Sequence, residues 1–121
     1  HRWLKSDSKI FEFTIDDDTK LYDVTFEFSH IYDYQYASVP IKIDVKNPSG
    51  EEEFHNIDFN IKDSKGKPLA DCGGDICDMS MNVIEKTKLL KGKYQIKVGH
   101  DFDGPYLPNV IGLGIKVTQS K

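Results

Sequence analysis

The chain has 121 residues, the length of a single domain, and its 38% hydrophobic and 30% charged residues exclude both a membrane span and a disordered tail. The 20 acidic and 16 basic side chains are mixed along the chain and leave a formal net charge of −4. Binding to nucleic acid requires clustered Lys and Arg, so we expect neither a nucleic-acid partner nor electrostatic docking to anionic lipid.

Apolar and polar side chains alternate with a two-residue period in the N-terminal half, the pattern of strands with one buried face. The alternation predicts strands at 11–15, 22–28, 41–45 and 57–61. Turn-forming residues separate them at 16–19, 47–50 and 63–66. In the second turn Pro fixes φ and Gly supplies positive φ, so we expect the two flanking strands to pair antiparallel.

The C-terminal third continues the pattern, with strands predicted at 94–98 and 113–117. Residues 79–90 fit neither a two-residue nor a helical period, so a short helix, a bulged strand and a loop all stay open there. Gly112 and Gly114 indicate a bulge or a close backbone approach within the last strand. The pattern as a whole predicts one all-β domain over residues 1–121, an antiparallel β-sandwich or jelly roll of about seven strands with little or no helix.

Two cysteines, Cys72 and Cys77, flank a Gly-Gly-Asp-Ile turn. A disulfide that closes so short a loop contributes about 2 kcal/mol in the chain-entropy model, and it indicates an oxidising compartment. The alternatives are free thiols, or a zinc site that would need His55 or His100 as further ligands. Because the chain contains no second spaced pair of ligands, we predict the disulfide.

No catalytic template is present: the chain lacks the nucleophile elbow, the P-loop, the H-E-x-x-H zinc motif and the Gly-rich dinucleotide turn. Cys72 or Cys77 could act as a nucleophile with His55 or His100 as the base. A cysteine with a disulfide partner is a poor nucleophile, however, so we expect no enzymatic activity and no cofactor.

Two further acidic side chains, Asp101 and Asp103, lie two positions apart and precede Gly104. Carboxylates at this spacing can bind a hard cation such as calcium. An EF-hand loop would need a third oxygen ligand and a Glu at its twelfth position, where this chain has Gly112. We therefore favour a plain turn after the 94–98 strand and keep Asp101 and Asp103 as weak metal candidates.

Three tyrosines, Tyr32, Tyr34 and Tyr36, alternate in sequence, and we call them the tyrosine row. If the segment is extended, all three rings lie on one face and can stack on a sugar or contact a protein. The competing interpretation is a core-facing strand whose hydroxyls reach the surface. The single tryptophan, Trp3, is expected to pack over one end of the sandwich.

Several segments occur along the chain in an order that carries information beyond any single motif. They are Trp3, Leu21-Tyr22-Asp23-Val24, His30, Tyr32-Asp33-Tyr34-Gln35-Tyr36, Pro48-Ser49-Gly50, Phe59-Asn60-Ile61-Lys62-Asp63, Gly66, Gly92-Lys93-Tyr94-Gln95-Ile96, Leu107-Pro108-Asn109-Val110 and Gly112-Leu113-Gly114-Ile115. In order and spacing they resemble the gliding-motility lipoprotein H (GldH) family of Bacteroidetes-type bacteria, from Trp3 to Val117. The Cys72 to Cys77 loop departs from the pattern of that family.

The resemblance implies a lipid-anchored envelope protein, whose removed N-terminus held a signal peptide and a lipidated cysteine, with the domain in the periplasm or at the cell surface. The start at His1, without Met or an apolar leader, fits that expectation. The resemblance further implies a protein needed for gliding and its associated surface machinery, in a family to which no enzymatic role is assigned. The leading hypothesis is therefore a non-enzymatic module that contacts envelope proteins. The alternative is a carbohydrate-binding sandwich that uses Tyr32, Tyr34 and Tyr36, with or without calcium.

Overall fold

The computed structural model describes residues 2–32 and 34–120, which form ten β-strands and no helix. The strands are β1 (Arg2–Leu4), β2 (Lys9–Ile15), β3 (Leu21–Ile31), β4 (Ser38–Lys46), β5 (Glu52–Asn60), β6 (Asp71–Gly73), β7 (Ile76–Lys88), β8 (Gly92–His100), β9 (Tyr106–Pro108) and β10 (Val110–Gln119). The prediction of an all-β fold is confirmed. The number of strands exceeds seven because β1, β6 and β9 have three residues each, too few to show a periodicity. Within these ranges no helix could span a membrane.

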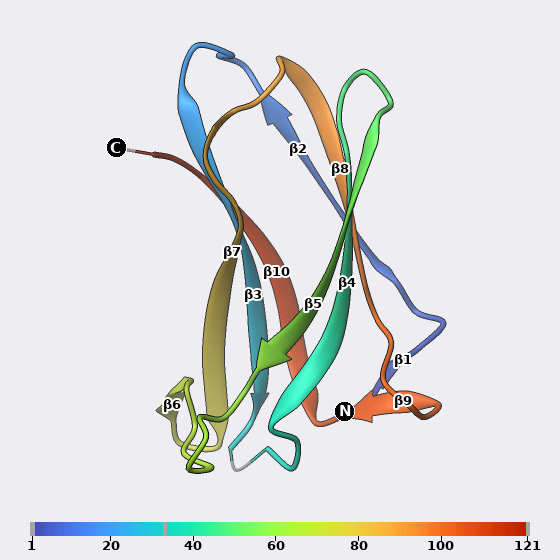
Figure 1. Cartoon of the computed structure of the whole chain (residues 1–121), viewed down its shortest axis with the longest axis vertical. Coiled ribbons are helices and arrows are strands. Elements are labelled where there is room, and N and C mark those ends of the chain that lie inside the picture. The colour runs from blue at the N-terminus through green and yellow to red at the C-terminus, as the bar shows by residue number, and fades with distance from the viewer. Residues whose placement is uncertain (1, 33, 121) are drawn as a thin grey trace.

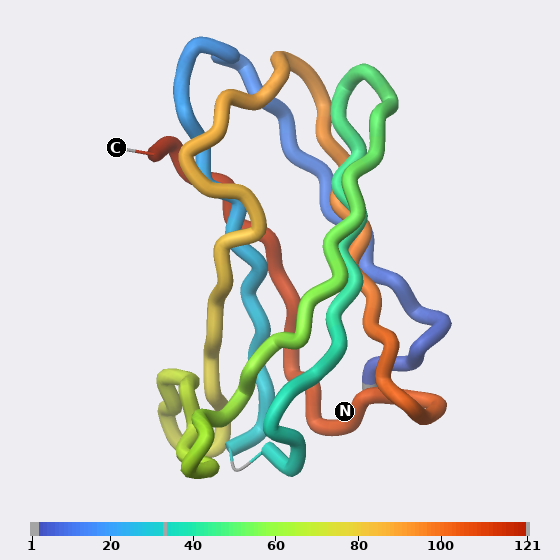
Figure 2. Tube along the Cα trace, viewed as in Figure 1, coloured from blue at the N-terminus to red at the C-terminus, as the bar shows by residue number. Residues whose placement is uncertain are grey.

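Two four-stranded antiparallel sheets face each other as a sandwich (Figure 1). We call them the β3 sheet, with strand order β10-β3-β7-β6, and the β4 sheet, with strand order β2-β8-β4-β5. Strands β1 and β9 pair separately at one end of the sandwich. The chain crosses between the two large sheets after β2, β3, β5 and β7, and again between β8 and β10 by way of β9. It stays in one sheet at the β4–β5 and β6–β7 hairpins (Figure 2).

The β4–β5 hairpin is the antiparallel pair that the sequence predicts. Its register runs without a shift from the pair Ser38 and Asn60 to the pair Lys46 and Glu52. The side chain of Asn47 stabilises the turn, because its Oδ1 accepts hydrogen bonds from the N–H groups two and four residues further on, at 2.9 and 3.0 Å. The result is a long, regular strand β5 at the edge of the β4 sheet.

Strand β7 occupies most of the segment whose structure the sequence leaves open. Its register against β3 shifts on both sides of Val24, so β7 is bulged near its C-terminal end. Lys86, in this irregular part, has a φ of 45°, and its N–H donates a hydrogen bond of 2.9 Å to Asp23 Oδ1. That bond lowers the pKa of Asp23. The extra residues break the two-residue period, which explains why neither template fits the sequence there.

The core lies between the two sheets and consists of the inward-facing half of each alternating strand. Phe26 and Phe28 of β3 contact Phe59 of β5 across the sandwich. The ring centroid of each lies 5.6 Å from the ring centroid of Phe59. Trp3 is buried at the end that β1 and β9 cover, as expected for a side chain that closes the sandwich.

Candidate functional site

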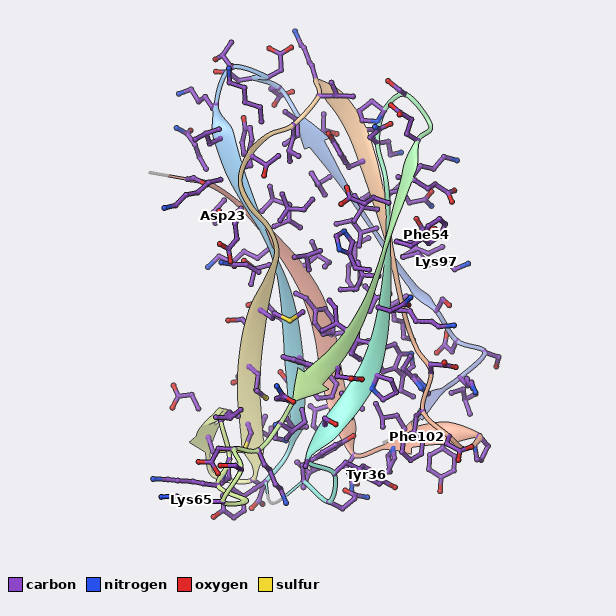
Figure 3. The ribbon with its side chains drawn as sticks, in the orientation of Figure 1. Asp23, Tyr36, Phe54, Lys65, Lys97 and Phe102 are labelled. Carbon is purple, nitrogen blue, oxygen red and sulfur yellow. A yellow bond between two sulfur atoms is a disulfide. The ribbon has the colours of Figure 1, made fainter. Side chains whose placement is uncertain are left out.

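The structure does not place the three tyrosines in one row. Tyr32 is 54% exposed, Tyr34 is 1% exposed and Tyr36 is half-buried. The Tyr34 hydroxyl donates a hydrogen bond of 2.8 Å to the carbonyl of Pro108, and burial raises the pKa of Tyr34. Tyr36 packs edge-on against Phe102 at the same end of the molecule (Figure 3). Three rings on one face are predicted for an extended segment, and that condition is not met, because the described residues here form a bent connection from β3 to β4.

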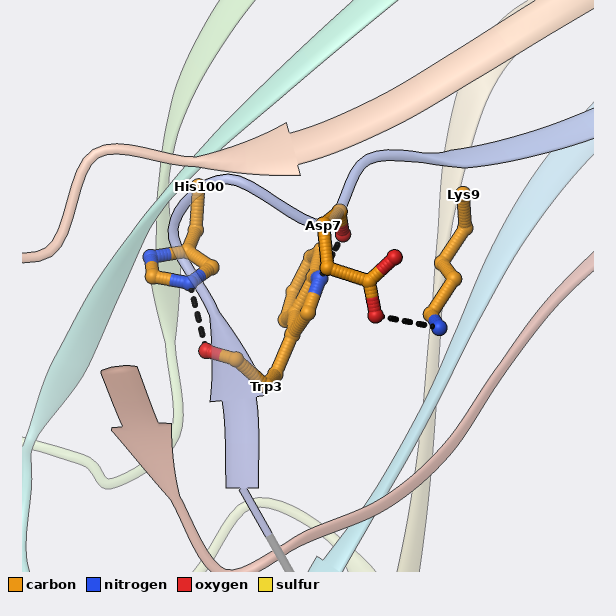
Figure 4. Close-up of polar contacts among 4 residues, drawn as sticks. All are labelled: Trp3, Asp7, Lys9 and His100. Atoms are coloured by element: carbon orange, nitrogen blue, oxygen red, sulfur yellow. Dashed lines mark hydrogen bonds and ion pairs between the residues drawn. The ribbon is translucent and has the colours of Figure 1, made fainter. Parts of the chain in front are cut away.

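Around His100, close contacts connect β8 to the N-terminal strand (Figure 4). The Nε2 atom of His100 lies 2.9 Å from the Trp3 carbonyl, and the Phe102 N–H donates to Nδ1 at 3.2 Å. A carbonyl accepts only and an N–H donates only, so the pair of bonds selects the neutral ring with its proton on Nε2. Burial, the dominant cause, lowers the pKa of His100. The Nε2 bond thus holds β1 against the sandwich, and the Nδ1 bond fixes the turn that follows β8.

The acidic pair that the sequence nominates for calcium is spread over a turn. Asp101 forms an ion pair of 3.5 Å with Lys5, and its N–H donates to the carbonyl of Pro40 at 3.0 Å. Asp103 is exposed. Among residues 2–32 and 34–120, no group of three or more His, Cys, Asp and Glu side chains is placed to hold a metal ion. The geometry gives Asp101 a structural partner in Lys5.

The predicted disulfide is confirmed: Cys72 of β6 is bonded to Cys77 of β7. The two residues lie directly opposite each other in the hairpin register, and Cys77 is buried whereas Cys72 is exposed. With both sulfurs bonded, neither can act as the nucleophile that the enzymatic hypothesis requires. The bond holds β6 on the edge of the β3 sheet.

The outer face of the β4 sheet carries two large exposed apolar side chains, Phe54 on β5 and Ile10 on β2. Phe54 is 69% exposed and Ile10 is 56% exposed, and no other large hydrophobic side chain in the described ranges is as exposed as Phe54. The register places Lys97 beside Ile10 and Asp44 beside both Lys97 and Phe54, so the four side chains form one line across the sheet. Phe54 and Lys97 project from this face together (Figure 3).

Strand β5 is also a free edge, since β4 is its one neighbour in the sheet order of the described residues. The Asn47 N–H donates to the Glu51 carbonyl at 2.9 Å, and the Ile61 N–H donates to the Ala37 carbonyl at 2.8 Å. Hydrogen-bonded pairs alternate with non-bonded pairs in an antiparallel ladder. The even-numbered residues of β5, from 52 to 58, therefore direct their backbone N–H and C=O groups away from β4.

Beside the N-terminal end of β5, a hollow of about 620 Å³ opens between β5 and β7, and we call it the acidic groove. Its lining includes the apolar side chains of Val45, Val83, Ile84, Leu89, Leu90 and Tyr94. Its polar side chains are Asn47, Glu51, Glu52, Glu53, Glu85, Thr87 and Lys88. Four carboxylates therefore stand against one ammonium group, and all five of these charged residues are exposed.

The β5 edge and the acidic groove form the candidate functional site, and the sequence carried one signal for it. In β5 the half-buried and buried side chains occupy odd-numbered positions, from His55 to Phe59, whereas Phe54 is even-numbered. A large apolar residue out of phase with the alternation points to the outer face of a sheet. The same signal marks Ile10, which is out of phase with Phe11 and Phe13.

Comparison with known proteins gives two matches over nearly the whole chain. The family model described as GldH lipoprotein matches residues 1–117. A protein of Christiangramia forsetii named "Gliding motility lipoprotein GldH homolog" is 24% identical over 128 residues, which cover 99% of this chain and 79% of that protein. No solved structure matches the chain significantly.

Proposed function

Because the chain belongs to the GldH lipoprotein family, we propose that its domain is a non-catalytic contact module that helps to assemble or stabilise a protein complex of the cell envelope. Membership of a lipoprotein family implies a membrane-anchored envelope protein. The name of the Christiangramia forsetii relative connects that protein with gliding motility, and we extend the connection to the complex proposed for this chain. We place the domain in the periplasm or at the cell surface, both of which suit a disulfide.

The observation that carries this proposal is the position of Phe54. Among the described residues Phe54 is the most exposed large apolar side chain, and it lies on a free strand edge, where unpaired backbone groups already invite another chain. Aromatic side chains, Phe among them, are enriched in protein interfaces. The surface therefore favours a protein partner.

The same geometry gives less support to carbohydrate binding through Tyr32, Tyr34 and Tyr36. A sugar platform needs at least two accessible, roughly coplanar rings. Tyr34 is 1% exposed, and its ring is inclined by 68° to that of Tyr36. The bonded cysteines and the occupied ring nitrogens of His100 likewise favour a module that acts without catalysis.

Crosslinking of the full-length lipidated protein in intact cell envelopes tests the proposal. The variant is Phe54→Ser, and the matched control is Leu69→Ser, because Leu69 is also exposed (53%) but lies in the loop before β6. We expect the wild type and Leu69→Ser to crosslink to the same envelope proteins and Phe54→Ser to lose them. Equal crosslinking by all three proteins, or recovery of glycan in place of protein, would contradict the proposal.

A further inference from the structure

We propose that the β5 edge binds an extended, basic segment of a partner protein, which adds as a fifth strand to the β4 sheet and places Lys or Arg side chains in the acidic groove. This inference rests on the proposed contact function and names the partner by its chemistry. In such a strand, basic side chains would alternate with apolar ones.

The backbone of β5 supplies the first requirement. The residues from Glu52 to Asp58 that point their N–H and C=O groups away from β4 form a regular edge, with no bulge and no proline in β5. The long edges on the other side of the sandwich differ. Strand β2 is shorter, with seven residues, and the register of β10 shifts between Val110 and Gly112. Strand β6 covers β7 only at residues 76–78, and the remaining edge of β7 is bulged near its C-terminal end. Among the described strands, β5 is therefore best suited to receive another strand.

The side chains on the two faces of β5 define what such a strand carries. On the outer face, an apolar residue placed opposite Phe54 would cover the exposed ring, as cross-strand aromatic pairs do. On the inner face, alternate side chains of the added strand would point into the acidic groove. A Lys or Arg there can lay its aliphatic stem on Val83 and Leu89 and bring its charge to the carboxylates of Glu53 and Glu85.

The charge of the groove is available to a partner. Glu51 and Glu85 accept long hydrogen bonds from the neutral amides of Asn47 and Asn82, at 3.4 and 3.3 Å. Glu53 lies 3.3 Å from His55 Nε2 and is 70% exposed. These contacts leave the carboxylates exposed to solvent and to an incoming cation.

A second copy of this chain is a poorer occupant. Residues 47–61 contain four acidic side chains and no Lys or Arg. Two β5 strands side by side would bring eight carboxylates along one edge without a basic partner, and like charges on neighbouring strands destabilise the pairing. A basic strand offers the complementary charge.

The test measures binding of the domain to a blocked peptide that alternates Lys or Arg with Val, with a peptide that alternates Glu with Val as the negative probe. The groove variant is Glu51→Gln/Glu53→Gln/Glu85→Gln. Its control is Asp16→Asn/Asp18→Asn/Asp103→Asn, which changes the net charge equally at exposed loop positions. The edge variant is Asn56→Pro, which removes an outward N–H and no hydrogen bond to β4, and its fold is checked by circular dichroism.

We expect the wild type and the loop control to bind the basic peptide within about twofold of each other, and the groove and edge variants to bind at least about tenfold more weakly. Equal weakening in the groove variant and the loop control would show non-specific attraction to an acidic protein and overturn the inference. Unchanged binding by the folded edge variant, no binding by the wild type, or a wild-type dimer that Asn56→Pro dissociates would overturn it too. If Phe54→Ser loses its envelope crosslinks but the wild-type domain does not bind the basic peptide, the contact function is supported and the basic strand is rejected. If the wild-type domain binds the peptide but forms no crosslinks in the envelope, the contact function is rejected.

Discussion

Substitution of Tyr34 tests whether its side chain stabilises the core or lies at the surface. Tyr34 is fully enclosed between Phe28, His30 and Tyr36, and its hydroxyl is bonded to the Pro108 carbonyl. Truncation of a buried aromatic ring to Ala costs about 4 kcal/mol of the free energy of unfolding. Tyr34→Phe keeps the ring and loses one buried hydrogen bond, which costs about 1.5 kcal/mol. Tyr32→Ala, at an exposed position, should change the free energy by less than about 0.5 kcal/mol.

Urea unfolding followed by tryptophan fluorescence measures these differences, because Trp3 is the single tryptophan and is buried. Domains typically have free energies of unfolding of about 5–15 kcal/mol, so Tyr34→Ala is only marginally folded if the wild type lies at the low end of that range. Tyr34→Phe loses less stability and can be compared with Tyr32→Ala in either case. Equal unfolding midpoints for Tyr34→Ala and Tyr32→Ala would refute the assignment of Tyr34 to the core. That result would restore the tyrosines as a surface feature.

Three further changes have expected outcomes in the same unfolding assay. Cys72→Ala/Cys77→Ala should lower the free energy of unfolding by about 2 kcal/mol, and thiol titration of the unfolded, unreduced wild type should find almost no free cysteine; two free thiols would exclude the disulfide. The stability of the wild type should fall as the pH falls from 7 to 5, because the unfolded chain binds a proton at His100 near pH 6.5 whereas the folded chain, with its lowered pKa, resists it; His100→Gln should reduce this slope, and an unchanged slope would contradict the assignment of a neutral, buried His100 ring. Gly92→Ala should lower the free energy of unfolding by about 2 kcal/mol, because Gly92 has a φ of 130° and an added Cβ would lie 2.8 Å from the proline ring of the β4–β5 turn. The control is Gly112→Ala, whose added Cβ meets no atom within 4 Å and should change the stability little. Equal effects of the two substitutions would contradict the turn geometry.

The two-residue alternation predicts the long strands because each of them has one face in the core. The phase of the pattern also assigns the buried positions: Phe26 and Phe28 face the core, and Glu27 between them faces solvent. The Asn47 turn predicts the β4–β5 hairpin from local chemistry alone. The disulfide follows from its short spacing, since few other arrangements satisfy two cysteines in one turn.

The features that the sequence could not predict depend on contacts between distant segments. The hydrogen bond of His100 to the Trp3 carbonyl joins residues 97 positions apart, and no local pattern encodes it. The tyrosines alternate in sequence, but they lie in a connection between sheets, so their spacing says nothing about which ring is buried. The acidic groove requires β5 and β7 to come together across the sandwich, although the glutamates themselves are plain in the sequence.

An unpaired edge as regular as β5 could pair with the same edge of a second copy of the chain. We expect its acidic side chains both to prevent this self-association and to select a basic partner. Glu52, Glu53 and Asp58 repel a second copy of the strand while they attract a basic one. The triple variant Glu52→Gln/Glu53→Gln/Asp58→Asn should therefore lose affinity for the basic peptide and gain self-association, which sedimentation velocity measures over a series of protein concentrations. Adding Asn56→Pro to this variant should return it to a monomer, because the dimer would use the same outward N–H. If the triple variant stays monomeric at every concentration, the acidic side chains of β5 are not what prevents self-association.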